Sequence, residues 1–359
     1  MELSQNFVRK VSSRIDWLLI LFILPIIIAG LVTMKSFAPL EDAGDFFSKQ
    51  IVWVLASVAI FFIFSFIDFR FLKRTDVLVF IFFLNSLILL ILFIFGNISH
   101  GAKSWFDFGY FSFQPVDIMK LVLVLILAFI PFVLVLLQPD FGSAMIIFFI
   151  WLGMVLVSGI SKMHLLLVFG SGLIIFASLW FLVFAPYQKA RIVDFINPLA
   201  DIHGSGYNAF QSTIAVGSGQ ITGKGLGFGT QSRLKFLPQP QSDFVFAAYA
   251  EEWGLIGSFL ILLLYGAIIL RILYSATLGA YNFEILFSMG IAIFFISHIF
   301  INIGMNLGLM PITGIPLPFM SYGGSHLLTE FAGLGILMSM KRYARSVHRD
   351  DTKNEFLGA

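Results

Sequence analysis

The chain has 359 residues, of which 59% are hydrophobic and 12% are charged, and its mean hydropathy is +0.96. Soluble domains are about half apolar and a quarter charged, so this composition excludes a soluble protein, and we expect no nucleic-acid partner. The chain lacks cysteine, which excludes a disulfide framework and a thiolate metal site. The net charge of +2 is uninformative, because the placement of charges in a membrane protein matters more than their sum.

An uncleaved membrane span is predicted near the N-terminus. Three basic residues (Arg9, Lys10 and Arg14) precede an apolar run at 17–32, which is too long for a signal-peptide core and has no cleavage site after it. A further run at 116–137 is interrupted by Pro131. The apolar segments of uninterrupted spanning length lie near 16–34, 51–67, 77–95, 143–158, 164–184, 244–270, 283–306 and 320–339.

The basic residues predict the orientation of these spans. The positive-inside rule places their clusters in the cytoplasm: Arg9, Lys10, Arg14, Arg70, Lys73, Arg74, Lys162, Arg271, Lys341, Arg342, Arg345 and Arg349. Both termini are then cytoplasmic, which requires an even number of crossings. Counting 116–137 once gives nine, and counting it twice gives ten, although each half is short for a crossing of about 20 residues. We expect an all-α polytopic membrane protein with about ten transmembrane helices and one long outer loop, 186–242, between helices 7 and 8.

Asp243 stands where that loop re-enters the membrane, directly before the apolar run from Phe244 to Leu270. A carboxylate at this junction touches water, lipid headgroups and a helix N-terminus, so it can ionise and still act on a molecule anchored in the bilayer. This favours an enzyme that works on a lipid-linked substrate at the membrane surface. The alternative is a helix N-cap, a role that aspartate favours, and spacing alone favours the cap.

The outer loop contains a glycine-rich segment, 217–227, that includes Lys224. No β-strand precedes it, no soluble helix follows it, and it lies on the wrong side of the membrane for ATP, so we do not expect a nucleotide site. Its backbone amides can approach a phosphate, or its glycines can serve tight turns only, and the sequence leaves both alternatives open. Lys224 is itself a candidate phosphate ligand.

Other charged residues lie at or inside the predicted spans. Asp117 and Lys120 are three positions apart, so they share a helix face and can pair, either structurally or to shape a cavity that handles diphosphate. Arg191 begins the outer loop, where its guanidinium can hold a diphosphate bidentately or simply extend to the interface. Glu251 and Glu252 lie deeper in their helix, and we interpret them as buried polar partners.

Four segments resemble the motifs of one family, in the same order. Residues 101–120 (GAKSWFDFGYFSFQPVDIMK) look like its first outer loop and QPSE-x-x-K motif, and 137–144 (LQPDFGSA) look like its QPD-G motif. Residues 206–257 resemble its signature region, and 302–325 (NIGMNLGLMPITGIPLPFMSYGGS) match its final loop and helix. This is the SEDS family (shape, elongation, division and sporulation) of peptidoglycan glycosyltransferases. The resemblance covers the whole chain, 1–359, as a single integral membrane domain, and TGIPLP at 313–318 is similar to the elongation branch, RodA, rather than to FtsW.

Two departures from the family pattern bear on the site and on the topology. Members usually have E-x-H-T-D where this chain has QPQSD at 239–243, so only the aspartate is retained. Members also carry a cytoplasmic arm between the fourth and fifth helices, and here Ala128 and Phe129 adjoin where it would lie. Either the arm was left out of this sequence or a natural deletion joined two helices, and we favour the first. This position coincides with the odd span count.

The resemblance implies that the chain polymerises lipid II into glycan during cell elongation, at the outer face of the bacterial inner membrane. It implies Asp243 as the general base, and we expect six substrate-binding residues: Asp117, Lys120, Arg191, Gln211, Ser212 and Lys224. Because the diphosphate leaving group is a weak base, one carboxylate with cations, or with a bound Mg²⁺ or Mn²⁺, suffices. The implied partners are a class B penicillin-binding protein, which crosslinks the glycan, and other proteins of the elongation complex.

Two other functions fit a polytopic chain with charges inside the membrane. The first is a flippase or transporter that moves lipid II without chemistry. Inverted-repeat transporters show matching broken helices in both halves, and this sequence has no such internal symmetry. The second is a scaffold that only positions a partner enzyme.

Overall fold

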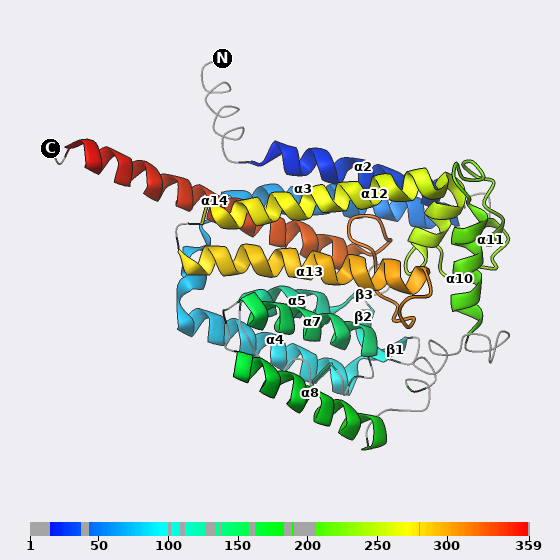
Figure 1. The fold of residues 1–359 in the computed structure, drawn as a ribbon, viewed down its shortest axis with the longest axis horizontal. Helices are drawn as coiled ribbons and strands as arrows, with labels where there is room; N and C mark the ends of the chain where they lie inside the picture. The colour runs from blue at the N-terminus through cyan, green and yellow to red at the C-terminus, as the bar shows by residue number, and fades with distance from the viewer. Residues whose placement is uncertain are drawn as a thin grey trace, which may run out of the picture.

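The computed structural model describes residues 15–36, 43–99, 102–107, 112–125, 140–157, 162–182, 206–279 and 281–357, with a few positions between 134 and 189. Most helices run along one direction, and α10 crosses one end of the bundle (Figure 1). The elements are α2 (Trp17–Ser36), α3 (Ala43–Phe66), the 3-10 helix η1 (Phe69–Lys73), α4 (Thr75–Phe95), β1 (Asn97–Ser99), β2 (Ala102–Asp107), β3 (Ser112–Phe113), α5 (Pro115–Leu125), α7 (Phe141–Val157), α8 (Lys162–Leu182), α10 (Tyr207–Ser218), α11 (Thr230–Arg233), α12 (Val245–Thr277), α13 (Asn282–Asn306) and α14 (Gly324–Leu357).

Five of the described helices are long and apolar enough to cross a membrane: α2, residues Phe46–Phe66 of α3, α4, α12 and α13. The apolar helix α7 is shorter. Long apolar segments form helices in lipid because every backbone amide and carbonyl is then paired within its own segment. The predicted class, an all-α multi-pass membrane protein, is confirmed. The count of ten crossings stays a prediction.

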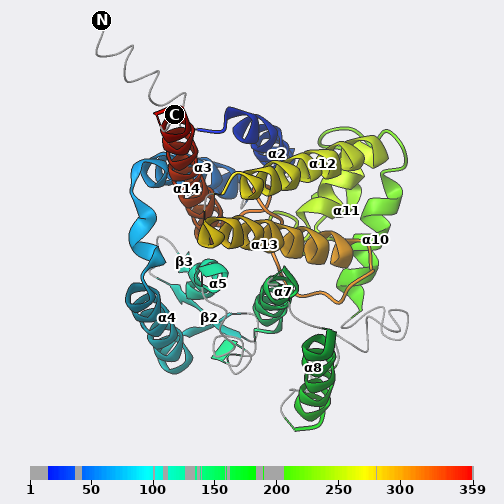
Figure 2. The same ribbon diagram turned by 60° about the vertical axis from the view of Figure 1, so that its left-hand side comes forward.

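Helix α13 lies in the middle of the bundle, among α12, α7, α5 and α14 (Figure 2). Of its most apolar stretch, 67% is buried inside the protein, against 17–39% in the other four candidate spans. A helix enclosed by protein can carry polar side chains that lipid would disfavour. The buried polar side chains of α13 are Glu284, Ser288, Ser297, His298, Asn302 and Asn306.

A small antiparallel sheet, in the order β1-β2-β3, connects α4 to α5. Trp105 lies opposite Asn97, and Phe106 lies opposite Phe113. The sequence does not predict this sheet, because strands of three, six and two residues are too short to show an alternating pattern. The sheet lies between two predicted spans, largely within the segment 101–120 that resembles the family's first outer loop.

Helix α12 consists of two helical segments that join at Gly254. The φ of 66° and ψ of −162° at this residue belong to a region that only glycine adopts readily. The glycine-rich loop fills the break and bonds backbone groups that the break frees. These hydrogen bonds, donor first, are Lys224 to Glu251 and Gly225 to Glu252 (3.0 Å each), Leu255 to Gln220 (2.9 Å) and Ile256 to Ile221 (3.1 Å). The predicted span 244–270 is therefore helical but interrupted.

A group of ion pairs lies at one end of the bundle. The α3–α4 junction and the α12–α13 turn share one end, and α10 and α11 lie at the other (Figure 1). At the first end, the Asp16 carboxylate lies 2.8 Å from Arg271 and 2.7 Å from Lys341, and Lys73 lies 3.0 Å from Glu284. Basic residues that the positive-inside rule assigns to the cytoplasm thus gather at the end opposite the start of α12.

Several predictions concern residues that the structure does not describe. Arg191 and the join at Ala128–Phe129 lie outside the described residues, as does most of 186–205. The described remainder of the predicted outer loop, from residue 206 onward, contains α10 and α11. The existence of a missing arm, and a substrate role for Arg191, stay predictions.

Candidate active site

The main chain around Asp243 is held by groups from two other segments. The side-chain amides of Asn302 and Asn306, on α13, each donate to the Asp243 carbonyl at 3.1 Å. The Ser321 hydroxyl donates to the Ser242 carbonyl at 2.6 Å, and the Tyr322 amide donates to the Gln241 carbonyl at 2.8 Å. The segment that carries the predicted catalytic aspartate is therefore fixed between α13 and the loop that precedes α14.

The N-cap of α12 is Phe244, one residue after Asp243, and its side chain makes no capping hydrogen bond. The amide of Ala247, in the first turn, donates instead to Oδ1 of Asn306 at 3.1 Å. A side chain from a neighbouring helix thus supplies an acceptor to this helix start. Asp243 is therefore not the N-cap residue of α12.

Gly314 lies beside the Asp243 carboxylate. A Cβ added to Gly314 would stand 3.4 Å from Oδ2 of Asp243, which is ordinary van der Waals contact. The φ of Gly314 is +70°, a conformation that glycine tolerates and that other residues rarely adopt. The carboxylate therefore faces bare backbone at this position.

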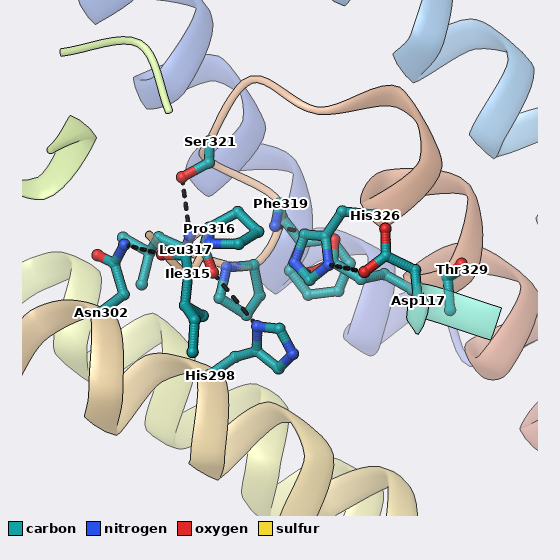
Figure 3. Close-up of polar contacts among 12 residues, drawn as sticks. Asp117, His298, Asn302, Ile315, Pro316, Leu317, Phe319, Ser321, His326 and Thr329 are labelled. Carbon is teal, nitrogen blue, oxygen red and sulfur yellow. Dashed lines mark hydrogen bonds and ion pairs between the residues drawn. The ribbon is translucent and has the colours of Figure 1, made fainter. Parts of the chain in front are cut away.

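The loop from Ile315 to Ser321 is held by hydrogen bonds to α12, α13 and α14, several of which are drawn in Figure 3. Asn302 donates to the Ile315 carbonyl at 2.6 Å, and the Ser321 hydroxyl accepts from the Leu317 amide at 2.7 Å. The remaining ties are His298 Nδ1 to the Pro316 carbonyl (3.3 Å), Tyr265 to the Pro318 carbonyl (2.5 Å) and the Phe319 amide to Glu330 (3.0 Å). These bonds hold residues 315–321 in place, within the segment 302–325 that resembles the family's final loop and helix.

Asp117 and Lys120 form the predicted pair, with 3.1 Å between Oδ1 and Nζ and exposures of 1% and 2%. The Ser325 hydroxyl donates to Asp117 at 2.7 Å, and His326 of α14 lies 3.9 Å from the same carboxylate (Figure 3). His326 also lies 2.7 Å from Glu330. The sequence predicts only the local pair, because the other members come from a helix far along the chain. His326 and Glu330 are four positions apart on α14, a spacing that predicts their contact with each other but not with Asp117.

Lys224 lies in the glycine-rich loop, where its ammonium is 2.7 Å from Glu251 and 2.8 Å from Thr230. Glu251 is fully buried and Glu252 is nearly so, as predicted for buried polar partners. The Glu251 carboxylate also accepts from the amides of Gln231 and Ser232 at the start of α11. The structure supports a turn-forming role for the loop's glycines, and a substrate role for Lys224 stays a prediction.

Gln211 and Ser212 lie on α10. Ser212 is fully buried, and its hydroxyl donates to the Asn306 carbonyl at 2.9 Å. Gln211 is half-buried beside it. Ser212 is therefore connected to the Asp243 main chain indirectly, through Asn306. The substrate roles of Gln211 and Ser212 stay predictions.

No group of three or more His, Cys, Asp or Glu side chains in the described part of the chain is placed to hold a metal ion. Mg²⁺ is commonly held by one or two carboxylates together with substrate phosphates. Asp243 is a carboxylate at the site that suits such binding, and a divalent cation stays a prediction.

Together, the bundle and the polar site define a multi-pass membrane protein with a candidate active site at one end of the bundle. The family model for FtsW, RodA and SpoVE, described as cell cycle protein, matches residues 12–130 and 124–346. The chain is 36% identical to the peptidoglycan glycosyltransferase MrdB of Escherichia coli K12 over 281 residues, covering 71% of this chain and 75% of MrdB. It is 34% identical to stage V sporulation protein E of Bacillus subtilis, covering 92% and 98% of the two chains.

Solved structures give the same answer. A chain of a peptidoglycan synthase complex that coordinates polymerization and crosslinking has a TM-score of 0.77 and 28% identity, covering 92% of this chain and 98% of that chain. The rod shape determining protein RodA of Thermus thermophilus has a TM-score of 0.67 and 27% identity, covering 91% and 96%. This chain belongs to the FtsW/RodA/SpoVE family, the SEDS family that its motifs resemble.

Proposed function

We propose that this protein is a peptidoglycan glycosyltransferase that joins lipid II units into glycan, with Asp243 as the general base. The observation that carries the proposal is the setting of Asp243, at the end of the bundle opposite the ion pairs that Arg271 and Lys341 make with Asp16. There its main chain is fixed by α13 and its carboxylate faces the backbone of Gly314. Relatives named peptidoglycan glycosyltransferase support the same reaction.

The reaction transfers a glycosyl group from one lipid-linked sugar to another. The 4-hydroxyl of the acceptor sugar attacks the anomeric carbon of the donor MurNAc, and the bond from that carbon to undecaprenyl diphosphate breaks with inversion. A sugar hydroxyl is a poor nucleophile, so the Asp243 carboxylate takes its proton as the new bond forms. The diphosphate leaves with the bonding electron pair and needs charge neutralisation rather than a general acid. This distinguishes the site from a glycosidase, which needs two carboxylates.

The other predicted residues take supporting roles in this proposal. Arg191 and Lys224 bring positive charge towards the diphosphate, and a Mg²⁺ or Mn²⁺ ion held by Asp243 and the substrate would add more. Gln211 and Ser212 lie on α10, whose residue Ser212 bonds Asn306 at the site. Asp117 and Lys120 are buried in their own pair, so they shape the site through α5 and α14 rather than by direct contact.

The partner and the location follow from the same proposal. A structural neighbour belongs to a complex that coordinates polymerization with crosslinking, which supports a class B penicillin-binding protein as the partner. We expect other proteins of the elongation complex to be further partners. The protein then lies in the bacterial inner membrane, with Asp243 at the outer face, where lipid II is polymerised. The RodA-like TGIPLP segment at 313–318 supports a role in elongation.

The test uses purified full-length protein and labelled lipid II, with and without a class B penicillin-binding protein. We expect glycan polymers on a gel and loss of lipid II. Transport of lipid II across vesicles without polymer, in both conditions, would favour a flippase. Polymer that forms only by the partner's own activity, with Asp243→Asn as active as the unchanged protein, would favour a scaffold.

A further inference from the structure

We propose that Asn302 and Asn306 are positioning residues for Asp243, an inference that rests on the proposed role of Asp243 as general base. Both side chains are fully buried. They are four positions apart on α13, so they project from the same face of the helix. Each donates a hydrogen bond to the Asp243 carbonyl at 3.1 Å.

The two amides bind more than this one carbonyl. The Asn302 amide also donates to the Ile315 carbonyl at 2.6 Å, next to Gly314, which faces the Asp243 carboxylate. One side chain thus holds both the catalytic main chain and the backbone opposite its carboxylate. Because both bonds come from a single amide, the two segments keep a fixed separation.

Asn306 completes the arrangement from the next turn of α13. Its amide donates to the Asn302 carbonyl at 2.8 Å, and its Oδ1 accepts from the Ala247 amide at 3.1 Å. It therefore fixes the carbonyl before the start of α12 and an amide in the first turn of α12 together. Ser212 reaches the Asn306 carbonyl at 2.9 Å, which links α10 to the same point.

The base must stand at a defined distance and angle from the acceptor hydroxyl, and a displacement of about 1 Å can cost about 10²-fold in rate. The side chain of Asp243 has two rotatable bonds, so fixing its main chain sets the arc on which the carboxylate can lie. The fixing groups come from α13, the most enclosed of the five candidate spans. A site built on a rigid element is more precise than one built on a loop alone.

A purely structural role for the same bonds has a different consequence. If the role is purely structural, removing the bonds lowers the melting temperature and the amount of folded protein, but the turnover per folded molecule stays the same. A positioning role lowers kcat in protein that is folded and still binds lipid II, so KM changes little. The split between kcat and KM therefore separates the two roles.

The test compares Asn302→Leu and Asn306→Leu with a matched control, Ser297→Ala. Leucine has the same number and branching of side-chain heavy atoms as asparagine but no hydrogen-bonding group, and each single change leaves the Asp243 carbonyl with one of its two donors. Ser297 is buried on the same helix and bonds only within it, to the Ile293 carbonyl at 2.7 Å. We expect each leucine variant to lose kcat by a factor on the order of 10 to 10², with KM within about twofold, and the control to keep both.

Folded leucine variants with unchanged kcat would overturn the inference. If a leucine variant does not fold, Asn302→Gln and Asn306→Gln are measured instead, because they keep the amide but displace it by one methylene. Unchanged kcat in folded glutamine variants would likewise overturn it. Asp243→Asn is assayed in parallel. If Asp243→Asn polymerises lipid II normally, the proposed function fails. If Asp243→Asn is inactive while the variants at positions 302 and 306 are fully active, only the positioning role is removed.

Discussion

Asp117 and Lys120 show how a pair of charges is tolerated inside the bundle. Each side chain is at most 2% exposed, and the carboxylate also receives the Ser325 hydroxyl. Breaking one partner of a buried ion pair leaves an uncompensated charge, which typically costs about 3 to 5 kcal/mol. Replacing both partners by apolar residues of similar size is often neutral, because the cost of desolvation then disappears.

Asp117→Leu should therefore lower the melting temperature and the yield of folded protein in detergent. The double variant with Lys120→Met should recover part of that loss, although Ser325 then lacks its acceptor. Thermal unfolding of the two single variants and the double variant measures the coupling between the charges. Single variants that melt at the temperature of the unchanged protein would show that the pair is incidental.

Some contacts of single residues can be predicted from the sequence alone, and others cannot. The i, i+3 spacing of Asp117 and Lys120 predicts their pairing, and the end of the polar loop predicts the place of Asp243. The roles of Asn302 and Asn306 depend on a carbonyl about 60 positions away in the chain, which only the tertiary structure reveals. Lys224 is a second example of a contact that the sequence does not predict, because its partner Glu251 is 27 positions away in the chain.

At the scale of elements, the break in α12 is the feature that the hydrophobic pattern does not predict. The residues on both sides of Gly254 are apolar enough for one span, and glycine alone lowers helix propensity only modestly. What opens the helix is the loop from Gly219 to Gly227, whose backbone bonds to both segments. The positions of the other described spans follow from their apolar length, whereas their exact ends depend on loops and caps.

Gly254→Ala should destabilise the protein strongly. Its φ/ψ region costs a non-glycine residue about 1 to 3 kcal/mol, and the new Cβ would approach the Gly223 amide nitrogen at 2.3 Å. Gly266→Ala is the matched control on the same helix, because a Cβ there meets nothing within 4 Å. We expect a lower melting temperature for the first and an unchanged or slightly higher one for the second. Equal melting temperatures would contradict the account of the break.

At the scale of the whole molecule, the two ends of the bundle have different roles. Asp16 pairs with Arg271 of α12 and Lys341 of α14 at one end, and the site around Asp243 lies at the other. The sequence predicts this polarity through the positive-inside rule, because basic residues cross the membrane poorly. The number of crossings depends on a region around Ala128–Phe129 outside the described residues.

The natural lack of cysteine allows a direct test of this topology. Thr222→Cys and Thr277→Cys place single thiols at exposed positions of the glycine-rich loop and the far end of α12. A membrane-impermeant thiol reagent applied to intact spheroplasts should label the first and not the second, and permeabilised cells should label both. Labelling of both in intact spheroplasts, or of the second alone, would contradict an outward-facing Asp243.

The most direct test of the account is the polymerisation of lipid II by Asp243→Asn. Asparagine has nearly the size of aspartate and caps helices about as well, but it does not accept the proton of the acceptor hydroxyl. We expect a variant that melts near the temperature of the unchanged protein and loses glycan synthesis by a factor on the order of 10² or more. A stable Asp243→Asn variant that polymerises lipid II at a near-normal rate would contradict the role of Asp243 as the base.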